Sequence, residues 1–389
     1  MKITKLETVL VKPRWCFLKV YTDEGIVGYG EPVVEGKART VAQAVRELEH
    51  HLVGRDPRRI QHHWQSMYRH SFYRGGPILT SAISGIEQAL WDILGKWLGV
   101  PVYQLLGGAC RDRIRLYAHC GGDTPQECTR NARELVGKGF TALKMGLGVM
   151  ARREKKGSLL PSALWSAVPV RIVDRPSVVD QVVERVGAVR DAVGREVDLA
   201  LDFHGQTSPA MAIRLAKALE QFDLMFIEEP CLPENVDVLA TVARSTSIPV
   251  ATGERLFTKW GFREVLEKQA ASVLQPDLCH AGGIFECRMI AAMAEGYYAA
   301  VAPHNPLGPI SLAACIQLDA CIPNFLVQEF TTLGEGYLKE PFRMVSGYVE
   351  LPERPGLGVE LDDEAVGEKI GHDWKSPMLF HEDGSVGDW

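Results

Sequence analysis

The chain lacks the features that mark membrane, secreted and nucleic-acid-binding proteins. No apolar run approaches the roughly 18 residues that span a bilayer, and the start, MKITKLETVLVKPRW, has no continuous apolar signal core. Basic residues are not in excess: 43 Lys and Arg stand against 49 Asp and Glu, so the formal net charge is −6. This balance argues against nucleic acid or an anionic membrane as a partner. The nine cysteines, an odd number without a C-x-x-C pair, favour reduced thiols and a cytoplasmic location.

What is present is the composition of a globular enzyme. The 389 residues are 46% hydrophobic and 24% charged, which predicts one large domain or two domains with a sizeable core. The strand and helix patterns of residues 1–112 predict an α+β capping domain. Apolar residues alternate on both sides of the turn at 22–25, as in a β-meander, and helical periodicity follows at 40–52, 60–68 and 79–98.

From Arg113 onward, strand-like runs alternate with helical patterns. The expectation is a TIM-type (β/α) barrel over 113–337. The tail, 338–389, is rich in Pro and Gly and is expected to pack back on the capping domain. The eight strand candidates read RIRLYAHC, TALKMG, DLALDFH, FIEEP, PVATGE, SVLQPD, AVAPHN and FLVQEF.

Three of these strands end in a carboxylate at a constant interval. Asp202 is followed 26 residues later by Glu228, with Glu229 as its alternative, and Glu254 follows Glu228 by another 26 residues. Successive strands of a parallel barrel would deliver these side chains to one rim. Carboxylate oxygens suit a hard divalent cation, so the pattern predicts a Mg²⁺ site. The alternative is three unrelated surface acids.

Two histidines and two more acids end or follow other strands. His204 lies two residues after Asp202, so along one strand both side chains would point the same way; acid/base work is favoured over metal ligation or a structural role. Asp277 and His304 would be neighbours, where the carboxylate fixes the imidazole tautomer and raises its basicity. A structural His304 in a Pro-rich turn is the alternative. Glu329 is a further rim carboxylate that could support a substrate carboxylate.

These groups together suit removal of a proton beside a carboxylate. Such a proton is too weakly acidic for an unaided histidine, whereas a divalent cation on the carboxylate oxygens stabilises the enediolate that forms. A second histidine can then protonate a departing β-hydroxyl.

The motifs resemble the enolase superfamily, mandelate racemase subgroup, almost from end to end. The resemblance implies that Asp202, Glu228 and Glu254 hold Mg²⁺, and it selects Glu228 over Glu229. It implies that His304, assisted by Asp277, abstracts the C2 proton of a sugar acid. His204 would then be the acid for the 3-hydroxyl and Glu329 a stabiliser of the transition state. The motifs are FYRGGP, ALWDILGK, LDFHG, FIEEP, GERLF, LQPDLCHAGGI, APHNPLGPISLAAC and HEDGSVGDW.

Departures from the family pattern bear on the reaction and the substrate. Racemases of the subgroup carry Lys-x-Lys where this chain has Lys144-Met145-Gly146, so the second lysine is missing and dehydration to a 2-keto-3-deoxy acid is favoured. The resemblance implies D-galactonate as the favoured substrate, but Gln206 and the long segment 147–176 depart from the family pattern and leave the exact sugar open. That segment is interpreted either as a loop over the barrel mouth or as a solvated insertion.

Other activities and assemblies stay open at this point. Within enzymes, the alternatives are a dehydratase of another aldonate such as D-gluconate, or an acid-sugar epimerase. A metal-binding barrel without catalysis is the alternative from another class. The expected partner is a small-molecule acid sugar, with no nucleic acid and no membrane, and the protein is expected to be a homo-oligomer.

Overall fold

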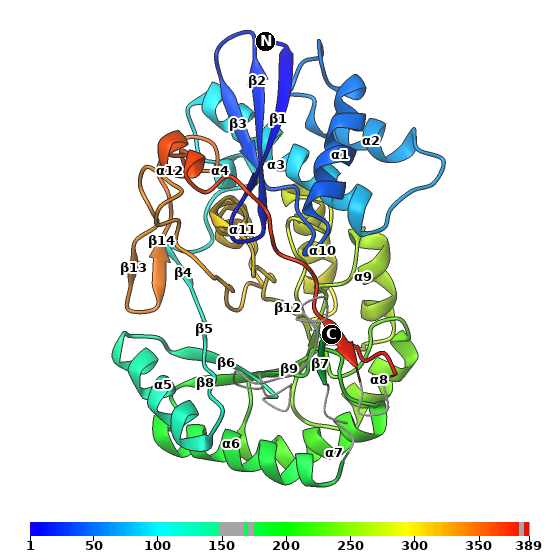
Figure 1. Ribbon diagram of the computed structural model, residues 1–389, viewed down its shortest axis with the longest axis vertical. Coiled ribbons are helices and arrows are strands. Elements are labelled where there is room, and N and C mark those ends of the chain that lie inside the picture. The colour runs from blue at the N-terminus through cyan, green and yellow to red at the C-terminus, as the bar shows by residue number, and fades with distance from the viewer. Residues whose placement is uncertain (148–166, 170–174, 381–384, 389) are drawn as a thin grey trace. The chain divides into compact units, whose positions relative to one another are not determined.

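The computed structural model describes residues 1–147, 167–169, 175–380 and 385–388 (Figure 1). Most of the long segment 147–176 therefore lies outside the described residues. Among those that are described, no helix is both long and apolar enough to cross a membrane. The chain forms two compact units: Met1–Leu116, Gly253–Glu264 and Leu274–Lys375 make up the first, and Tyr117–Thr252, Val265–Val273 and Ser376–Trp389 the second.

The first unit begins with a three-stranded antiparallel sheet. Leu18 of the central strand lies opposite Thr8 on one side and Gly30 on the other. The backbone turns back between Thr22 and Ile26, where the amide of Thr22 donates to the carbonyl of Ile26 at 3.1 Å. The expected β-meander is confirmed. Its strands are β1 (Ile3–Val11), β2 (Trp15–Thr22) and β3 (Val27–Gly30).

The long helix expected at 79–98 is confirmed as α3 (Pro77–Leu98), which ends at Gly99 in the left-handed conformation (φ 73°). A proline in the first turn and a glycine after the last are the usual signals for such bounds. Strand β3 lies close against α3, because a Cβ on Gly30 would collide with the carbonyl of Gly85. The other expected helices are confirmed as α1 (Ala38–Leu48), extended by η1 (Glu49–His51), and α2 (Ile60–Arg69); a short α4 (Val102–Leu105) follows α3.

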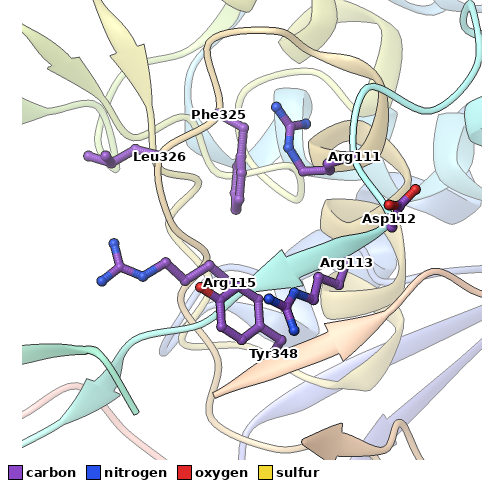
Figure 2. Close-up of a pocket in the computed structure, with 7 residues that line it drawn as sticks. All are labelled: Arg111, Asp112, Arg113, Arg115, Phe325, Leu326 and Tyr348. Carbon is purple, nitrogen blue, oxygen red and sulfur yellow. The ribbon is translucent and has the colours of Figure 1, made fainter. Parts of the chain in front are cut away.

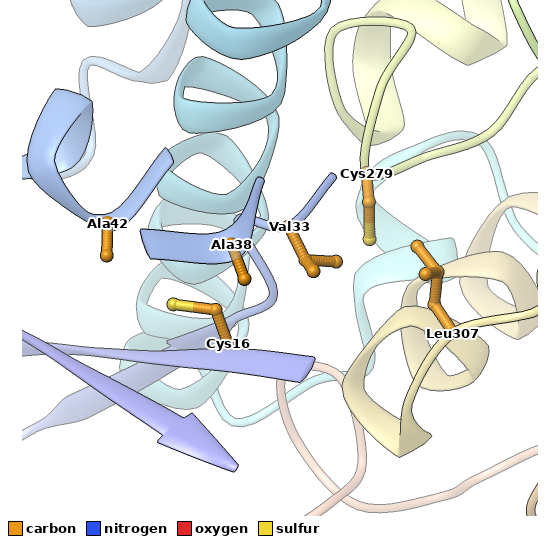
Figure 3. Close-up of a cluster of buried hydrophobic side chains, with 6 residues drawn as sticks. All are labelled: Cys16, Val33, Ala38, Ala42, Cys279 and Leu307. Atoms are coloured by element: carbon orange, nitrogen blue, oxygen red, sulfur yellow. The ribbon is translucent and has the colours of Figure 1, made fainter. Parts of the chain in front are cut away.

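A small apolar cluster joins the amino-terminal elements to later loops of the same unit (Figure 3). Its side chains come from β2, from the segment between β3 and α1, from α1, and from the later segments that carry Cys279 and Leu307. Burying them removes apolar surface from water and so stabilises the arrangement of these loops. The members are Cys16, Val33, Ala38, Ala42, Cys279 and Leu307.

The second unit contains a parallel sheet in the order β10-β9-β8-β6-β5, with a helix after most strands. Its register places Asp202 opposite both Gly146 and Glu228. The strands are short and most of their residues are buried, as expected for a parallel sheet covered by helices. They are β5 (Ala118–His119), β6 (Ala142–Gly146), β8 (Asp198–Asp202), β9 (Phe226–Glu228) and β10 (Val250–Thr252).

Side-chain caps begin several helices of this unit. The side chains of Thr124, Ser208 and Asn235 each accept a hydrogen bond from the amide three residues later. Such caps satisfy amides that have no partner within the helix, and they set where each helix begins. The helices are α5 (Pro125–Gly137), α6 (Ser177–Val193), α7 (Pro209–Leu219), η3 (Glu220–Phe222) and α8 (Val236–Arg244); β7 (Ala167–Pro169) pairs with β15 (Met378–Phe380).

The alternation of strand and helix continues in the later part of the chain. The amide of Ala302 donates to the carbonyl of Leu274 at 2.9 Å, which joins the strands on either side of α10. These elements are α9 (Thr258–Glu267), β11 (Val273–Leu274), α10 (Ile284–Glu295), β12 (Ala300–Val301) and α11 (Pro309–Cys321).

Two of the eight expected strands differ in the structure. The last candidate, FLVQEF, forms only isolated parallel bridges, Val301 with Phe325 and Leu116 with Gln328. The first candidate, RIRLYAHC, is interrupted: its beginning, β4 (Arg113–Arg115), pairs antiparallel with the tail. A run of apolar residues cannot reveal that its hydrogen-bonding partner changes midway.

The tail contacts both the sheet and the long helix of the first unit. The amide of Gly371 donates to the carbonyl of Leu10 at 2.9 Å, and that of Leu357 to the Asp92 carboxylate at 2.8 Å. The three-part division at 112 and 337 remains a prediction about domain boundaries. The tail elements are β13 (Met344–Val345), β14 (Tyr348–Glu350) and α12 (Asp363–Gly367).

Candidate active site

His304 lies at the centre of a cluster of carboxylates in the first unit. Its Nδ1 atom is 2.9 Å from Oδ2 of Asp277, and its Nε2 atom is 3.2 Å from Oε2 of Glu254 and 4.0 Å from Oε2 of Glu329. The Asp277 side chain is completely buried and that of His304 is 15% exposed. The structure thus brings together four of the seven residues predicted for the site.

The surroundings of His304 strongly favour its protonated form in the metal-free chain. Burial lowers the imidazole pKa, but the carboxylates of Glu254, Asp277 and Glu329 outweigh burial and raise it to about 10. Stabilisation of an imidazolium by nearby negative charge is the physical cause.

Backbone amides and a turn hold the Asp277 carboxylate in place. The amide of Cys279 donates to Oδ1 at 2.6 Å, which leaves Oδ2 for His304. The amides of His280 and Ala281 donate to the Asp277 carbonyl. Because Asp277 is fixed on both its main chain and its side chain, it fixes the orientation of the imidazole in turn.

Polar residues on α3 bond the segment that carries Asp277. The hydroxyl of Ser81 is 3.0 Å from Nδ1 of His280, and that of Ser84 accepts a hydrogen bond from the Gly282 amide at 2.9 Å. The amide group of Gln88 donates to the Leu278 carbonyl at 3.0 Å. The spacing of Ser81, Ser84 and Gln88 places them on one face of the helix.

Glu31 similarly holds the segment that follows His304. Its carboxylate accepts hydrogen bonds from the amides of Gly308, at 2.7 Å, and Ser311, at 2.9 Å, where α11 begins. Burial raises the pKa of Glu31 to about 8, although these two amides lower it. Gln88 contributes here too, because its side-chain oxygen accepts a hydrogen bond from the Glu31 amide.

The second unit holds the other predicted residues. Asp202 and Glu228 end neighbouring strands in register, so their side chains start from the same edge of the sheet. Nζ of Lys144, on β6, contacts both carboxylate oxygens of Glu228, at 2.8 and 2.9 Å, and both side chains are buried. Glu229, the alternative to Glu228, instead accepts a hydrogen bond from the Thr252 hydroxyl at 2.6 Å.

His204 does not continue the strand that ends at Asp202. Its φ is +53°, a left-handed conformation, so an argument from strand alternation does not apply to its side chain. The two residues still interact: the His204 amide donates to Oδ1 of Asp202 at 2.7 Å, and Nδ1 lies 3.7 Å from Oδ2. Burial raises the pKa of Asp202, but the His204 side chain and the charge of Lys144 outweigh burial and lower it.

The predicted metal ligands have the right chemistry, since all three are carboxylates and a hard divalent cation prefers oxygen donors. Asp202 and Glu228 belong to the second unit and Glu254 to the first. Among the described residues, no three His, Cys, Asp or Glu side chains form a ready metal site. The ligand set of Asp202, Glu228 and Glu254 therefore remains a prediction.

The sequence did not predict two residues that support the site, Gln88 on α3 and Glu31, which directly follows β3. Each is a single polar residue, and no pattern around it predicts a role in the site. The available signal was the polar residues within an otherwise apolar helix, since a buried polar group needs a hydrogen-bond partner. Those at 0–1% exposure on α3 are Thr80, Ser81, Ser84, Glu87, Gln88 and Asp92.

Comparisons with known proteins cover nearly the whole chain. Residues 4–107 match the model of the mandelate racemase / muconate lactonizing enzyme N-terminal domain, and residues 127–365 that of the enolase C-terminal domain-like family. The D-galactonate dehydratases of Variovorax paradoxus (strain S110) and Ralstonia pickettii (strain 12J) are 47% and 48% identical, over 100% of each chain.

Solved structures of the same superfamily resemble this chain over nearly its whole length. A member of the enolase superfamily from Salmonella typhimurium is 34% identical, with a TM-score of 0.85 over 94% of this chain and 98% of its own. A mandelate racemase/muconate lactonizing enzyme-like protein from Roseovarius sp. TM1035 is 34% identical, with a TM-score of 0.84 over 95% and 96%.

Proposed function

Because the chain belongs to the mandelate racemase/muconate lactonizing enzyme family of the enolase superfamily, we propose that it is a hydro-lyase that dehydrates a sugar acid. The expected fold, a (β/α) barrel with an N-terminal α+β capping domain, is that of the family and is confirmed by both matches. D-galactonate is the proposed substrate, since proteins 47–48% identical over their full length carry the name D-galactonate dehydratase.

The observation that carries the proposal is the pair formed by His304 and Asp277. With Asp277 accepting the proton of Nδ1, the neutral imidazole has its lone pair on Nε2. Nε2 is then the atom that takes the proton from C2 of the sugar acid. A base positioned in this way contributes about 10²–10⁴-fold to a rate.

Dehydration also requires that the 3-hydroxyl leave with a proton. We assign this proton to His204, which is partly exposed beside Asp202. The C2–H electron pair forms the C2–C3 double bond as the C3–O bond breaks and water leaves. The resulting enol becomes the 2-keto-3-deoxy acid when C3 gains a proton.

A divalent cation, Mg²⁺ in this proposal, would be held by Asp202, Glu228 and Glu254. When bound, it supplies positive charge beside the substrate carboxylate, which makes the C2 proton more acidic. Glu329, 2% exposed and bonded to the amide of Asn305 at 2.8 Å, would stabilise charge that develops on the substrate.

The absence of a second available lysine base on β6 favours dehydration over racemisation. Its ammonium group is committed to the buried Glu228 carboxylate. Gly146 stands where racemases of the subgroup have a second lysine, so this chain has no lysine there to act as a second base. Epimerisation is the alternative with less support.

The sugar itself is the least constrained part of the proposal. Gln206 and the segment 147–176 are the candidate determinants, and D-gluconate or another aldonate is the alternative substrate. A homo-oligomer and a cytoplasmic location also remain predictions. The nine free cysteines, eight of them buried, suit a reducing compartment.

The test is a screen of the purified protein with Mg²⁺ against a panel of aldonates and aldarates, following formation of the 2-keto-3-deoxy product. Turnover of D-galactonate alone is the expected result. Turnover of another acid would retain the mechanism and replace the substrate. An inactive protein that binds Mg²⁺ would reject the dehydratase proposal, and His304→Asn is the matched inactive control.

A further inference from the structure

A pocket of about 420 Å³ on the first unit is lined by residues that the dehydration chemistry does not use (Figure 2). They come from the segment before and within β4, from the segment that follows α11, and from β14. None of them is among the predicted catalytic or metal-binding residues. The lining residues are Arg111, Asp112, Arg113, Arg115, Phe325, Leu326 and Tyr348.

The charge of this pocket is opposite to that of the whole protein. Three of its seven lining residues are arginines and one is an aspartate, whereas the chain carries a formal net charge of −6. A concentration of positive charge in a concave surface attracts anions.

Arg111 is held in place by its neighbours. Its guanidinium lies over the ring of Phe325, 5.0 Å from the ring centre, and donates to the backbone carbonyls of Asp319 and Pro323. These two bonds use two of its five N–H donors. Because the side chain is already ordered, an anion that binds it would cost little further side-chain entropy.

Arg113 is also oriented by an aromatic ring. Its guanidinium lies 4.1 Å from the centre of the Tyr348 ring, and Figure 2 shows this ring on the other side of the pocket from Phe325. Within the described part of the chain, neither Arg111 nor Arg113 forms an ion pair with a carboxylate. Both therefore keep guanidinium donors for a ligand.

The pocket and Glu329 lie at opposite ends of one run of residues in the first unit. Phe325 begins the run that Glu329 ends, and the two are about 13 Å apart along an extended chain. The parallel bridge between Leu116 and Gln328 shows that residues 325–329 run in the same direction as the segment that follows β4. A ligand in the pocket would thus be distinct from the sugar acid that reacts.

We propose that this pocket is a second ligand site, which binds a small metabolite carrying a phosphate group or several carboxylates. The planar guanidinium matches both groups, because it can form two parallel hydrogen bonds to one phosphate or carboxylate. Phe325 and Tyr348 provide the walls and orient the arginines. The site needs neither metal nor catalytic turnover, so it does not depend on the proposed function.

Titration calorimetry at constant ionic strength tests this site with three probes: inorganic phosphate, a hexose phosphate and citrate. At least one probe is expected to bind with a Kd of about 1 mM or lower. Preference for the phosphates identifies a phosphate ligand, and preference for citrate a polycarboxylate. Absence of saturable binding by all three would overturn the proposal.

Variants place the binding in the pocket. Arg113→Ala should weaken it at least tenfold, and Arg113→Lys should also weaken it, because an ammonium keeps the charge but loses the paired donors. Arg113 is exposed, so its replacement should leave the fold intact. Arg69→Ala, which removes an exposed arginine at the end of α2, is the matched control and should bind as the parent does. Equal affinity of Arg113→Ala and the parent would refute the assignment.

Discussion

The Nε2 atom of His304 lies 3.2 Å from Oε2 of Glu254, so the proposed base and a proposed metal ligand are in direct contact. This contact couples the protonation of the imidazole to the charge on the carboxylate. In the metal-free chain it favours the imidazolium, which cannot accept a proton from a substrate. A cation on Glu254 would reduce that effect and return the imidazole toward its neutral form.

The first prediction is therefore that metal binding lowers the pKa of His304. Without metal this pKa is about 10, against the ordinary 6.5, and it should fall when Mg²⁺ is added. Glu254→Gln should lower the pKa without metal, since it removes the negative charge nearest Nε2. NMR titration of the imidazole measures both. A His304 pKa that is the same with and without saturating Mg²⁺ would contradict the coupling.

The raised pKa also predicts the direction in which metal-free stability changes with pH. The folded chain binds the His304 proton more tightly than the unfolded chain does. The resulting stabilisation is fully present below pH 6.5 and is lost as the pH rises toward about 10. Urea unfolding at several pH values measures the free energy of unfolding. In the parent it should include a decrease from His304 between pH 6.5 and about 10, and in His304→Asn this decrease should be absent.

The second prediction separates the base from its positioning partner. His304→Asn should abolish dehydration, and Asp277→Asn should reduce kcat by about 10²–10⁴-fold, because an amide cannot stabilise the imidazolium as a carboxylate does. Neither substitution replaces a proposed metal ligand, so both variants should still bind Mg²⁺ in calorimetry; His304→Asn should bind it at least as tightly as the parent, because it removes the imidazolium beside Glu254. Substantial turnover by His304→Asn would remove it from the role of base.

The third prediction concerns the metal ligands. Glu254→Gln replaces a charged oxygen donor with a neutral amide and should weaken Mg²⁺ binding at least about tenfold, or 1.4 kcal/mol. Calorimetry with Mg²⁺ measures this directly and does not require turnover. Glu229→Gln is the matched control, because Glu229 is a neighbouring buried carboxylate that bonds to the Thr252 hydroxyl and is not a proposed ligand. Unchanged affinity of Glu254→Gln would exclude that residue from the ligand set.

The fourth prediction tests the support that α3 gives to Asp277. Gln88→Leu leaves the Leu278 carbonyl and the Glu31 amide without this partner, and should cost about 1–3 kcal/mol of the free energy of unfolding. A shifted Asp277 should also lower kcat more than it changes KM, and should move the pH profile of kcat. Gln43→Leu, at an exposed position of α1, should do neither. If Gln88→Leu loses stability but keeps the parent pH profile, Gln88 is structural and does not position the base.

The carboxylates of the candidate site could be predicted from the sequence, because each one ends or closely follows an apolar run that is typical of a strand. The apolar runs before Asp202, Glu228 and Glu254 are strands in the structure, and a charged residue directly after such a run is visible in the sequence. The proximity of Asp277 to His304 also followed from the expected order of parallel strands.

The missed features depend on tertiary contacts. Glu31 and Gln88 act on segments more than 180 residues away in sequence, and no local pattern links them. The left-handed backbone at His204 cannot be predicted from strand periodicity, because that periodicity assumes that the strand continues. β4 similarly pairs with the distant β14, and its own residues do not specify this partner.

The last prediction concerns Asp319, a completely buried residue of α11. Among the described residues neither of its carboxyl oxygens has a hydrogen-bond partner. Burial raises the pKa of Asp319 well above the ordinary 3.8, although Arg111 lowers it. The folded chain thus retains a proton that the unfolded chain releases near pH 3.9.

This difference makes Asp319 a source of instability as the pH rises. Its contribution is most favourable below about pH 3.9 and declines above it by up to about 1.4 kcal/mol per pH unit until the folded-state pKa is reached. Asp319→Asn cannot ionise, so it should remove this slope and stabilise the protein at neutral pH. Urea unfolding between pH 5 and 8 measures the effect, with Asp191→Asn, at an exposed position of α6, as control. Identical slopes for Asp319→Asn and the parent would show that Asp319 is ionised in the folded chain despite its burial.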